Sequence, residues 1–135
     1  MYIPGTILMW TAFIAGLAST LTYWLSIKAP ERWRSAARQS YVLMTAAIVI
    51  ASGVLMYLLL AHDYRLHYVW AYSDNLLPLH YLVSTFWAGQ EGSLLLWAWM
   101  LSVMSAIAAL ARRKLDFKGE PVTLAALAGA NAFFA

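Results

Sequence analysis

The chain has 135 residues, of which 63% are hydrophobic and only 11% charged, and its mean hydropathy is +0.66. These values lie outside the range of water-soluble domains and predict a membrane protein. Because cysteine is absent, disulfides, thiolate metal sites and Cys-x-x-Cys redox centres are excluded within the chain. The net charge of +3 does not require nucleic acid as a partner, since basic residues in a membrane protein set its orientation.

Three uncharged stretches are long enough to cross a bilayer as helices, which takes about 20 apolar residues. They cover residues 3–27, 39–62 and 92–111. The first lacks the basic start of a signal peptide, so we expect it to be retained. A fourth apolar stretch, residues 121–135, would reach only about 22 Å as a helix, which predicts an incomplete span and a truncated chain, with a re-entrant hairpin as the alternative.

Small residues recur at helical spacing within the predicted spans. Ala12, Gly16 and Thr20 follow this rhythm in the first span, and Ala47 and Ala51 repeat it in the second. Small side chains let helix backbones approach closely in a membrane. The pattern therefore predicts tight helix packing and carries no information about chemistry.

Eight of the nine basic residues fall into two clusters, one between the first and second spans and one after the third. They are Lys28, Arg32, Arg34, Arg38, Arg112, Arg113, Lys114 and Lys118. Because loops rich in lysine and arginine stay in the cytoplasm, the clusters predict that the N-terminus and residues 63–91 are extracytoplasmic. The predicted fold is therefore an all-α polytopic membrane protein with three full spans and a truncated fourth.

Residues 63–91 form the longest non-spanning part of the chain. The short polar side chains of Ser73, Asp74 and Asn75 favour a turn, and Pro78 suits a first helical turn. Apolar residues then recur at spacings of three and four over residues 76–87. This pattern predicts an amphipathic helix that is too short to span and lies along the outer membrane interface.

The least generic stretch runs from Trp87 to Ser93 and reads Trp-Ala-Gly-Gln-Glu-Gly-Ser. On a purely structural interpretation, Glu91 and Ser93 only terminate a helix, with Gly92 or Ser93 as its cap. Trp87, Trp97 and Trp99 then only anchor that helix at the interface. The functional interpretation is a rigid ledge that binds a flat apolar ligand or a partner protein. Residue spacing alone leaves both interpretations open.

Three histidines, His62, His67 and His80, map to the predicted outer side, where neutral imidazole could ligate haem iron. We expect none of them to do so, because His62 ends a span and His80 lies on the polar face of an interfacial helix. Charged loop residues such as Asp63 and Arg65 are expected to be solvated. No catalytic residue and no metal-ligand set of recognisable spacing can be nominated.

Three runs in this region resemble the first extracytoplasmic region of the CcmF/NrfE haem lyases: Asp63 to Val69, Ser73 to Pro78, and Trp87 to Trp97. Gln90 stands where many members carry histidine, and the family's Asn-Ser-Asn turn is altered here to Ser-Asp-Asn. The positions that match the family pattern or stand in its motif are candidate site residues by this resemblance: Asp63, Asn75, Pro78, Trp87, Gly89, Gln90, Glu91, Gly92, Ser93 and Trp97.

The resemblance implies a role in cytochrome c-type biogenesis, in which haem is accepted from a haem chaperone and attached to the thiols of an apocytochrome c. Other membrane assembly subunits would be partners, and the resemblance places the chain in the inner membrane of a bacterium or archaeon. The family's haem-ligating histidines and Trp-rich segment are absent, so this chain alone is expected neither to ligate haem nor to act as a lyase. The competing hypothesis is a fragment of an ion or solute transporter, or a structural membrane subunit without haem.

Overall fold

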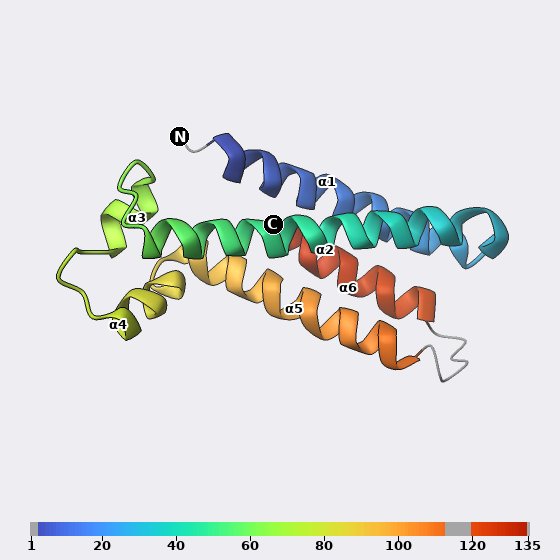
Figure 1. Cartoon of the computed structure of the whole chain (residues 1–135). Helices are drawn as coiled ribbons and strands as arrows, with labels where there is room; N and C mark the ends of the chain where they lie inside the picture. The colour runs from blue at the N-terminus through green and yellow to red at the C-terminus, as the bar shows by residue number, and fades with distance from the viewer. Residues whose placement is uncertain (1–2, 113–119, 135) are drawn as a thin grey trace.

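The structure is a computed structural model that describes residues 3–112 and 120–134 (Figure 1). Within these residues every regular element is helical, as the sequence predicts. The elements in chain order are α1 (Ile3–Ser26), α2 (Pro30–Leu60), α3 (His67–Tyr72), α4 (Leu79–Ser84), the short 3₁₀ helix η1 (Thr85–Trp87), α5 (Gln90–Arg112) and α6 (Glu120–Phe134).

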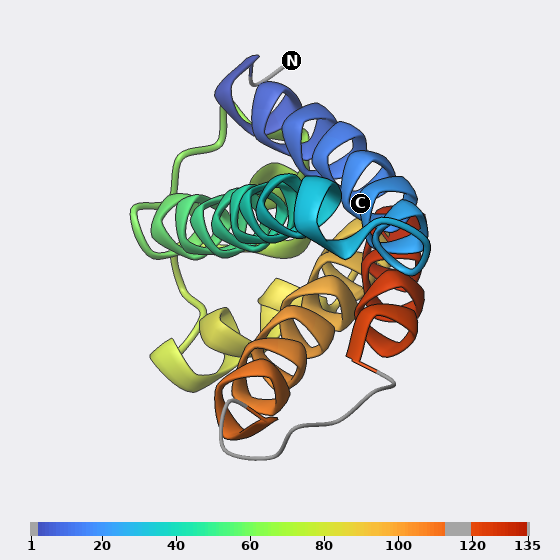
Figure 2. The same ribbon diagram turned by 90° about the vertical axis from the view of Figure 1, so that its right-hand side faces the viewer.

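The four longer helices form a bundle in which each packs on two others. Helix α1 contacts α2 and α6, and α5 contacts the same two helices from the other side. Figure 2 looks along this bundle from the end that carries the turn between α1 and α2. The short helices α3 and α4 gather at the opposite end, where α1 begins (Figure 1).

Among the described residues, α1 and α2 are long and apolar enough to cross a membrane. The 24 residues of α1 correspond to about 36 Å, which exceeds a hydrocarbon core of roughly 30 Å. The 23-residue α5 does not belong to that set, so the crossing predicted for residues 92–111 stays a prediction. Helix α6 is a shorter apolar helix of 15 residues, and residue 135 lies outside the described part.

Helix α2 begins well before residue 39, where its apolar stretch was predicted to start. Pro30 opens the helix, a position where the missing N–H of proline costs no hydrogen bond. The polar residues that follow, including Arg34 and Arg38, continue the helix beyond its apolar part. The helix is therefore longer than the apolar stretch from which it was predicted.

The small residues of α1 pack as their spacing predicts. A Cβ atom added to Gly16 would lie 2.8 Å from the Cβ of Ala132 in α6 and 3.2 Å from the sulfur of Met44 in α2. One turn further on, Thr20 faces Gly129 of α6 and donates its hydroxyl to the Gly16 carbonyl at 2.9 Å. Gly16 thus lies where three helices meet, and only a hydrogen fits there.

A buried polar contact joins α5 to α6. The Ser102 hydroxyl donates to the Asn131 side-chain oxygen at 3.1 Å, and both side chains are fully buried. The Asn131 amide also donates to the Leu127 carbonyl at 3.0 Å. Because buried polar groups are costly when unpaired, this pair favours one register of α6 on α5.

The described basic residues of the first cluster, Lys28, Arg32, Arg34 and Arg38, lie in the α1–α2 turn and the first turns of α2. They are therefore at the end of the bundle opposite α3 and α4 (Figure 1). In the second cluster, Arg112 ends α5, while Arg113, Lys114 and Lys118 lie outside the described residues. The bundle thus separates its first basic cluster from residues 63–91, which we call segment 63–91.

Candidate functional site in segment 63–91

Segment 63–91 begins where a capping motif stops α2. His62 has a positive φ of 52°. Its N–H bonds the Leu59 carbonyl at 3.2 Å, and the Asp63 N–H bonds the Leu58 carbonyl at 3.0 Å. These two bonds define a Schellman cap with a left-handed residue at its centre. His62 therefore has a backbone role in turning the chain.

Asp63 and Arg65 form an ion pair with each other. The Arg65 guanidinium donates to both Asp63 carboxylate oxygens, at 2.8 and 2.6 Å, and the Arg65 backbone N–H donates at 3.2 Å. These hydrogen bonds hold the pKa of the Asp63 carboxyl below its ordinary value. The two residues were expected to be solvated loop charges, and Arg65 is 86% exposed; the ion pair adds a contact that stiffens the start of the segment.

The predicted turn at residues 73–75 is present. The Asp74 carboxylate accepts the Leu76 N–H at 3.1 Å, and the Asp74 carbonyl accepts the Leu77 N–H at 3.1 Å. Asn75 accepts a hydrogen bond from the Tyr64 hydroxyl at 2.7 Å. This bond ties the turn back to the start of the segment, which gives Asn75 a structural role.

The helix predicted over residues 76–87 is shorter and divided. Pro78 stands immediately before α4 with an extended backbone (ψ 148°), so the helix begins at Leu79 and not at residue 76. The Ser84 hydroxyl bonds the Tyr81 carbonyl at 2.7 Å, and the Thr85 hydroxyl bonds the Leu82 carbonyl. Such side-chain bonds compete with the helical ladder, and the chain tightens into η1 at this point.

The centre of the segment is the hydroxyl of Tyr68, which is buried. It donates towards the carbonyl oxygens of Thr85 and Phe86, at 3.0 and 3.1 Å, and accepts the Gly89 N–H at 3.0 Å. Burial raises the pKa of Tyr68 above its ordinary value of 10.0. Tyr68 therefore joins α3 to the junction between η1 and α5.

The two glycines of the motif make this contact possible. A Cβ atom on Gly89 would lie 2.6 Å from the Tyr72 ring and 2.8 Å from the Tyr68 ring. A Cβ atom on Gly92 would lie 2.0 Å from the Phe86 carbonyl oxygen and 2.1 Å from the Tyr68 hydroxyl. We call these four residues, Tyr68, Tyr72, Gly89 and Gly92, the tyrosine–glycine cluster.

The sequence did not single out either tyrosine as a site residue. The sequence offered only an indirect indication of this contact. Two glycines three residues apart at a helix start indicate that another segment of the protein packs closely against them. Which residue approaches could be known only once α3 was seen to fold back against the junction. Tyr68 and Tyr72 are the two residues of the candidate site that the sequence missed.

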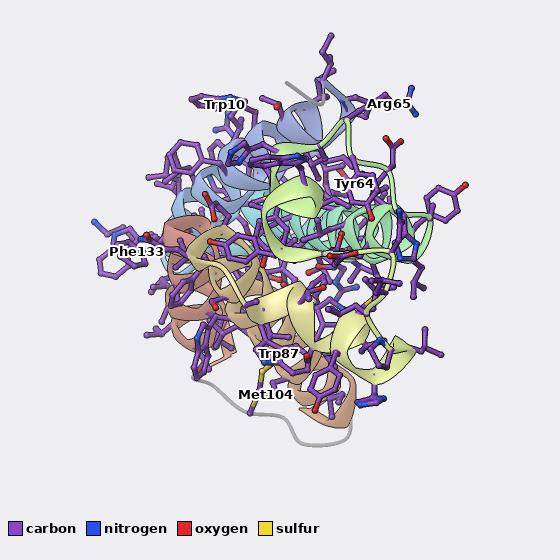
Figure 3. All side chains as sticks on the ribbon, turned by 90° about the vertical axis from the view of Figure 1, so that its left-hand side faces the viewer. Trp10, Tyr64, Arg65, Trp87, Met104 and Phe133 are labelled. Atoms are coloured by element: carbon purple, nitrogen blue, oxygen red, sulfur yellow. The ribbon has the colours of Figure 1, made fainter. Side chains whose placement is uncertain are left out.

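The other motif residues take different positions. Helix α5 begins at Gln90, so the predicted cap at Gly92 or Ser93 is wrong, because both residues lie inside the helix. Glu91 lies in the first turn, where the helix dipole favours a carboxylate. Ser93 instead donates its hydroxyl to the Trp87 carbonyl at 2.8 Å. Trp87 and Trp97 are 47% and 56% exposed (Trp87 is labelled in Figure 3).

The histidines do not form a metal centre in the described part of the chain, where no three His, Asp or Glu side chains converge. His67 is exposed on α3 beside Trp70, and His80 is exposed with its ring against that of Tyr81. No chemical step is assigned to iron in this chain.

Replacing Tyr68 with phenylalanine should loosen segment 63–91. The change leaves the Gly89 N–H and two carbonyl groups without their partner, at a cost of about 1–3 kcal/mol. Faster amide exchange across residues 85–93, measured in detergent, would register the loss. The pKa of Tyr68 is raised in the folded state, so the stabilisation that its hydroxyl gives is present below about pH 10 and is lost as the pH rises through the folded-state pKa. The phenylalanine variant should not show this pH dependence. Unchanged exchange would contradict the prediction.

Together, the helical bundle, its two membrane-capable helices and its compact segment 63–91 define a helical membrane protein.

Three similar proteins indicate the family of the chain. The chain is 35% identical over 92 residues to the cytochrome c-type biogenesis protein CcmF of Haemophilus influenzae, covering 68% of this chain and 14% of that protein. It is 34% identical over 123 residues to the cytochrome c-type biogenesis protein NrfE of the same organism, covering 90% and 19%. With the probable NrfE of Escherichia coli the identity is 40% over 82 residues, covering 61% and 15%.

The chain therefore belongs to the CcmF/NrfE family of cytochrome c-type biogenesis proteins, as its segment 63–91 suggested. It spans less than a fifth of the length of these relatives. No protein-family model matches the chain. No solved structure matches it either. The transporter hypothesis receives no support from these similarities.

Proposed function

We propose that this chain serves in cytochrome c-type biogenesis as a membrane-embedded component that presents segment 63–91 to an apocytochrome c. The observation that carries the proposal is the identity of 34–40% to cytochrome c-type biogenesis proteins, over as much as 90% of the chain. Haem would be cargo of the complete assembly, and a haem chaperone and further membrane subunits would be its other partners.

The construction of segment 63–91 supports a binding role. Its ion pair, its turn and the tyrosine–glycine cluster hold a surface that would otherwise be a long irregular connection. Trp87, Gln90 and Glu91 are exposed on that surface. A surface ordered before its partner arrives loses less conformational entropy on binding than a flexible one.

The proposed role is tested by photo-crosslinking in membranes that contain a tagged apocytochrome c. A photoreactive residue at Gln90 should form an adduct with the apocytochrome, because Gln90 is exposed at the centre of the proposed surface. Ser35, which is exposed near the other end of the bundle, is the matched control and should form none. Adducts at both positions, or at neither, would contradict the proposal.

We further propose that the N-terminus and segment 63–91 face the extracytoplasmic side of a bacterial or archaeal inner membrane. The separation of the first basic cluster from segment 63–91 supports this orientation. Helix α5 would be the third span, and α4 with η1 would lie at the outer interface.

The orientation can be measured with single cysteines, because the chain contains no cysteine of its own. Leu76, which is 90% exposed, is replaced by cysteine in one variant, and the exposed Ser35 in another. A membrane-impermeant maleimide should label Leu76→Cys in intact spheroplasts, and Ser35→Cys only after permeabilisation. The reverse pattern would show that the proposed orientation is wrong.

A further inference from the structure

A large cavity opens at the end of the bundle that carries α3. Its volume is about 820 Å³, within the range of roughly 300–1,000 Å³ that is usual for ligand pockets. The walls come from α1, α2, α5 and the end of α6, and α3 covers it. Its lining is mostly apolar and includes Met9, Phe13, Leu55, Leu58 and Leu95.

The rim of the cavity carries charge of both signs. Arg65 and Glu91 both line it and are both exposed. Arg65 is paired with Asp63, which does not itself line the cavity, so the guanidinium at the lining has one carboxylate beside it and Glu91 supplies another. A ligand with two acidic groups would be repelled by this arrangement, whereas one that bears a cation and an anion would be matched by it.

The apolar walls continue onto exposed surface. Trp10 and Phe133 line the cavity and are 61% and 83% exposed. Figure 3 looks onto this end and shows Phe133 pointing away from the bundle, with Trp10 above it beside the N-terminal part of α1. In a membrane, this side of the bundle is open to hydrocarbon chains, while the rim lies at the end of the helices.

We propose that the cavity binds a zwitterionic glycerophospholipid. An acyl chain occupies the apolar interior, the ammonium group of the head lies at Glu91, and the phosphate lies at Arg65, since guanidinium groups bind phosphate well. One ligand of this kind accounts for the apolar interior of the cavity, the charges of both signs at its rim and its opening on the side of the bundle. The inference does not depend on the proposed function, because it uses no feature of haem or cytochromes.

The test uses residues 1–135 purified in mild detergent and then stripped of lipid. Native mass spectrometry follows the binding of added phosphatidylethanolamine and of anionic phosphatidylglycerol. Ala71→Trp places an indole in the cavity from the exposed side of α3 and should weaken phosphatidylethanolamine binding by about tenfold or more. Ala61→Trp, at an exposed position outside the cavity, is the control and should bind like the parent chain.

The head group is tested separately. Glu91→Gln keeps the size of the side chain and removes its charge, so it should weaken binding of phosphatidylethanolamine and not of phosphatidylglycerol. Equal binding by the parent chain and Ala71→Trp would show that the lipid lies elsewhere and overturn the proposal. A preference for phosphatidylglycerol, or a co-purified tetrapyrrole with its Soret absorbance in place of phospholipid, would also overturn it, and the tetrapyrrole would favour the proposed function.

Discussion

Gly92→Ala should disrupt segment 63–91 strongly, although it adds only one methyl group. The new Cβ would lie 2.0 Å from the Phe86 carbonyl oxygen and 2.1 Å from the Tyr68 hydroxyl, and one of these atoms is backbone. The contact can be relieved only if the start of α5 moves or Tyr68 leaves its site. We expect a local cost of about 2–4 kcal/mol, from overpacking and the lost hydrogen bonds of Tyr68.

This cost is measured by hydrogen exchange at the Gly89 amide, which Tyr68 protects. A loss of about 2 kcal/mol corresponds to exchange roughly 30-fold faster. Gly53→Ala is the matched control, because no atom lies within 4 Å of its added Cβ and alanine favours a helix by roughly 1 kcal/mol. If both variants exchange like the parent chain, the close contact at Gly92 is wrong.

Gly16→Leu is expected to separate α6 from α1. Even one added carbon would lie 2.8 Å from the Ala132 Cβ, and leucine brings three more atoms into the same contact. Overpacking of this kind costs about 3 kcal/mol or more when backbone must move. Since α6 is short, the loss of its contact with α1 should displace it from the bundle while α1 and α2 remain paired.

A disulfide reports this displacement, because the chain has no other cysteine. Thr20 and Gly129 face each other across the α1–α6 contact, with the added Cβ of Gly129 3.6 Å from the Thr20 hydroxyl oxygen. Cysteines at these two positions should oxidise readily in the parent chain and poorly with Gly16→Leu. Gly53→Leu, on the open face of α2, should leave the disulfide yield unchanged. Equal yields in all three chains would contradict the predicted separation.

Several features followed from the sequence alone, because they depend on composition and local spacing. Uncharged stretches located α1 closely and the later part of α2, and the small residues around Gly16 predicted the tight helix contact. The turn at Asp74 followed from its short polar side chain. The motif from Trp87 to Ser93 led to the family to which the chain belongs.

Other expectations were wrong or incomplete, for physical reasons that can be named. The helix predicted over residues 76–87 is divided because Pro78 keeps an extended backbone and two hydroxyl groups bond to carbonyls in the turn. Helix α3 was missed because six residues are too few for a periodic pattern to emerge.

The sequence by itself thus determined the all-helical membrane class and the family, since apolar length and an ordered motif are properties of the chain. Only the tertiary structure decided what the motif does in the fold. Gly89 and Gly92 are small because Tyr68 and Tyr72 approach them, and those tyrosines are about 20 residues away in the chain. The cavity is likewise assembled from five helices, and no local spacing encodes a space that exists only when they meet.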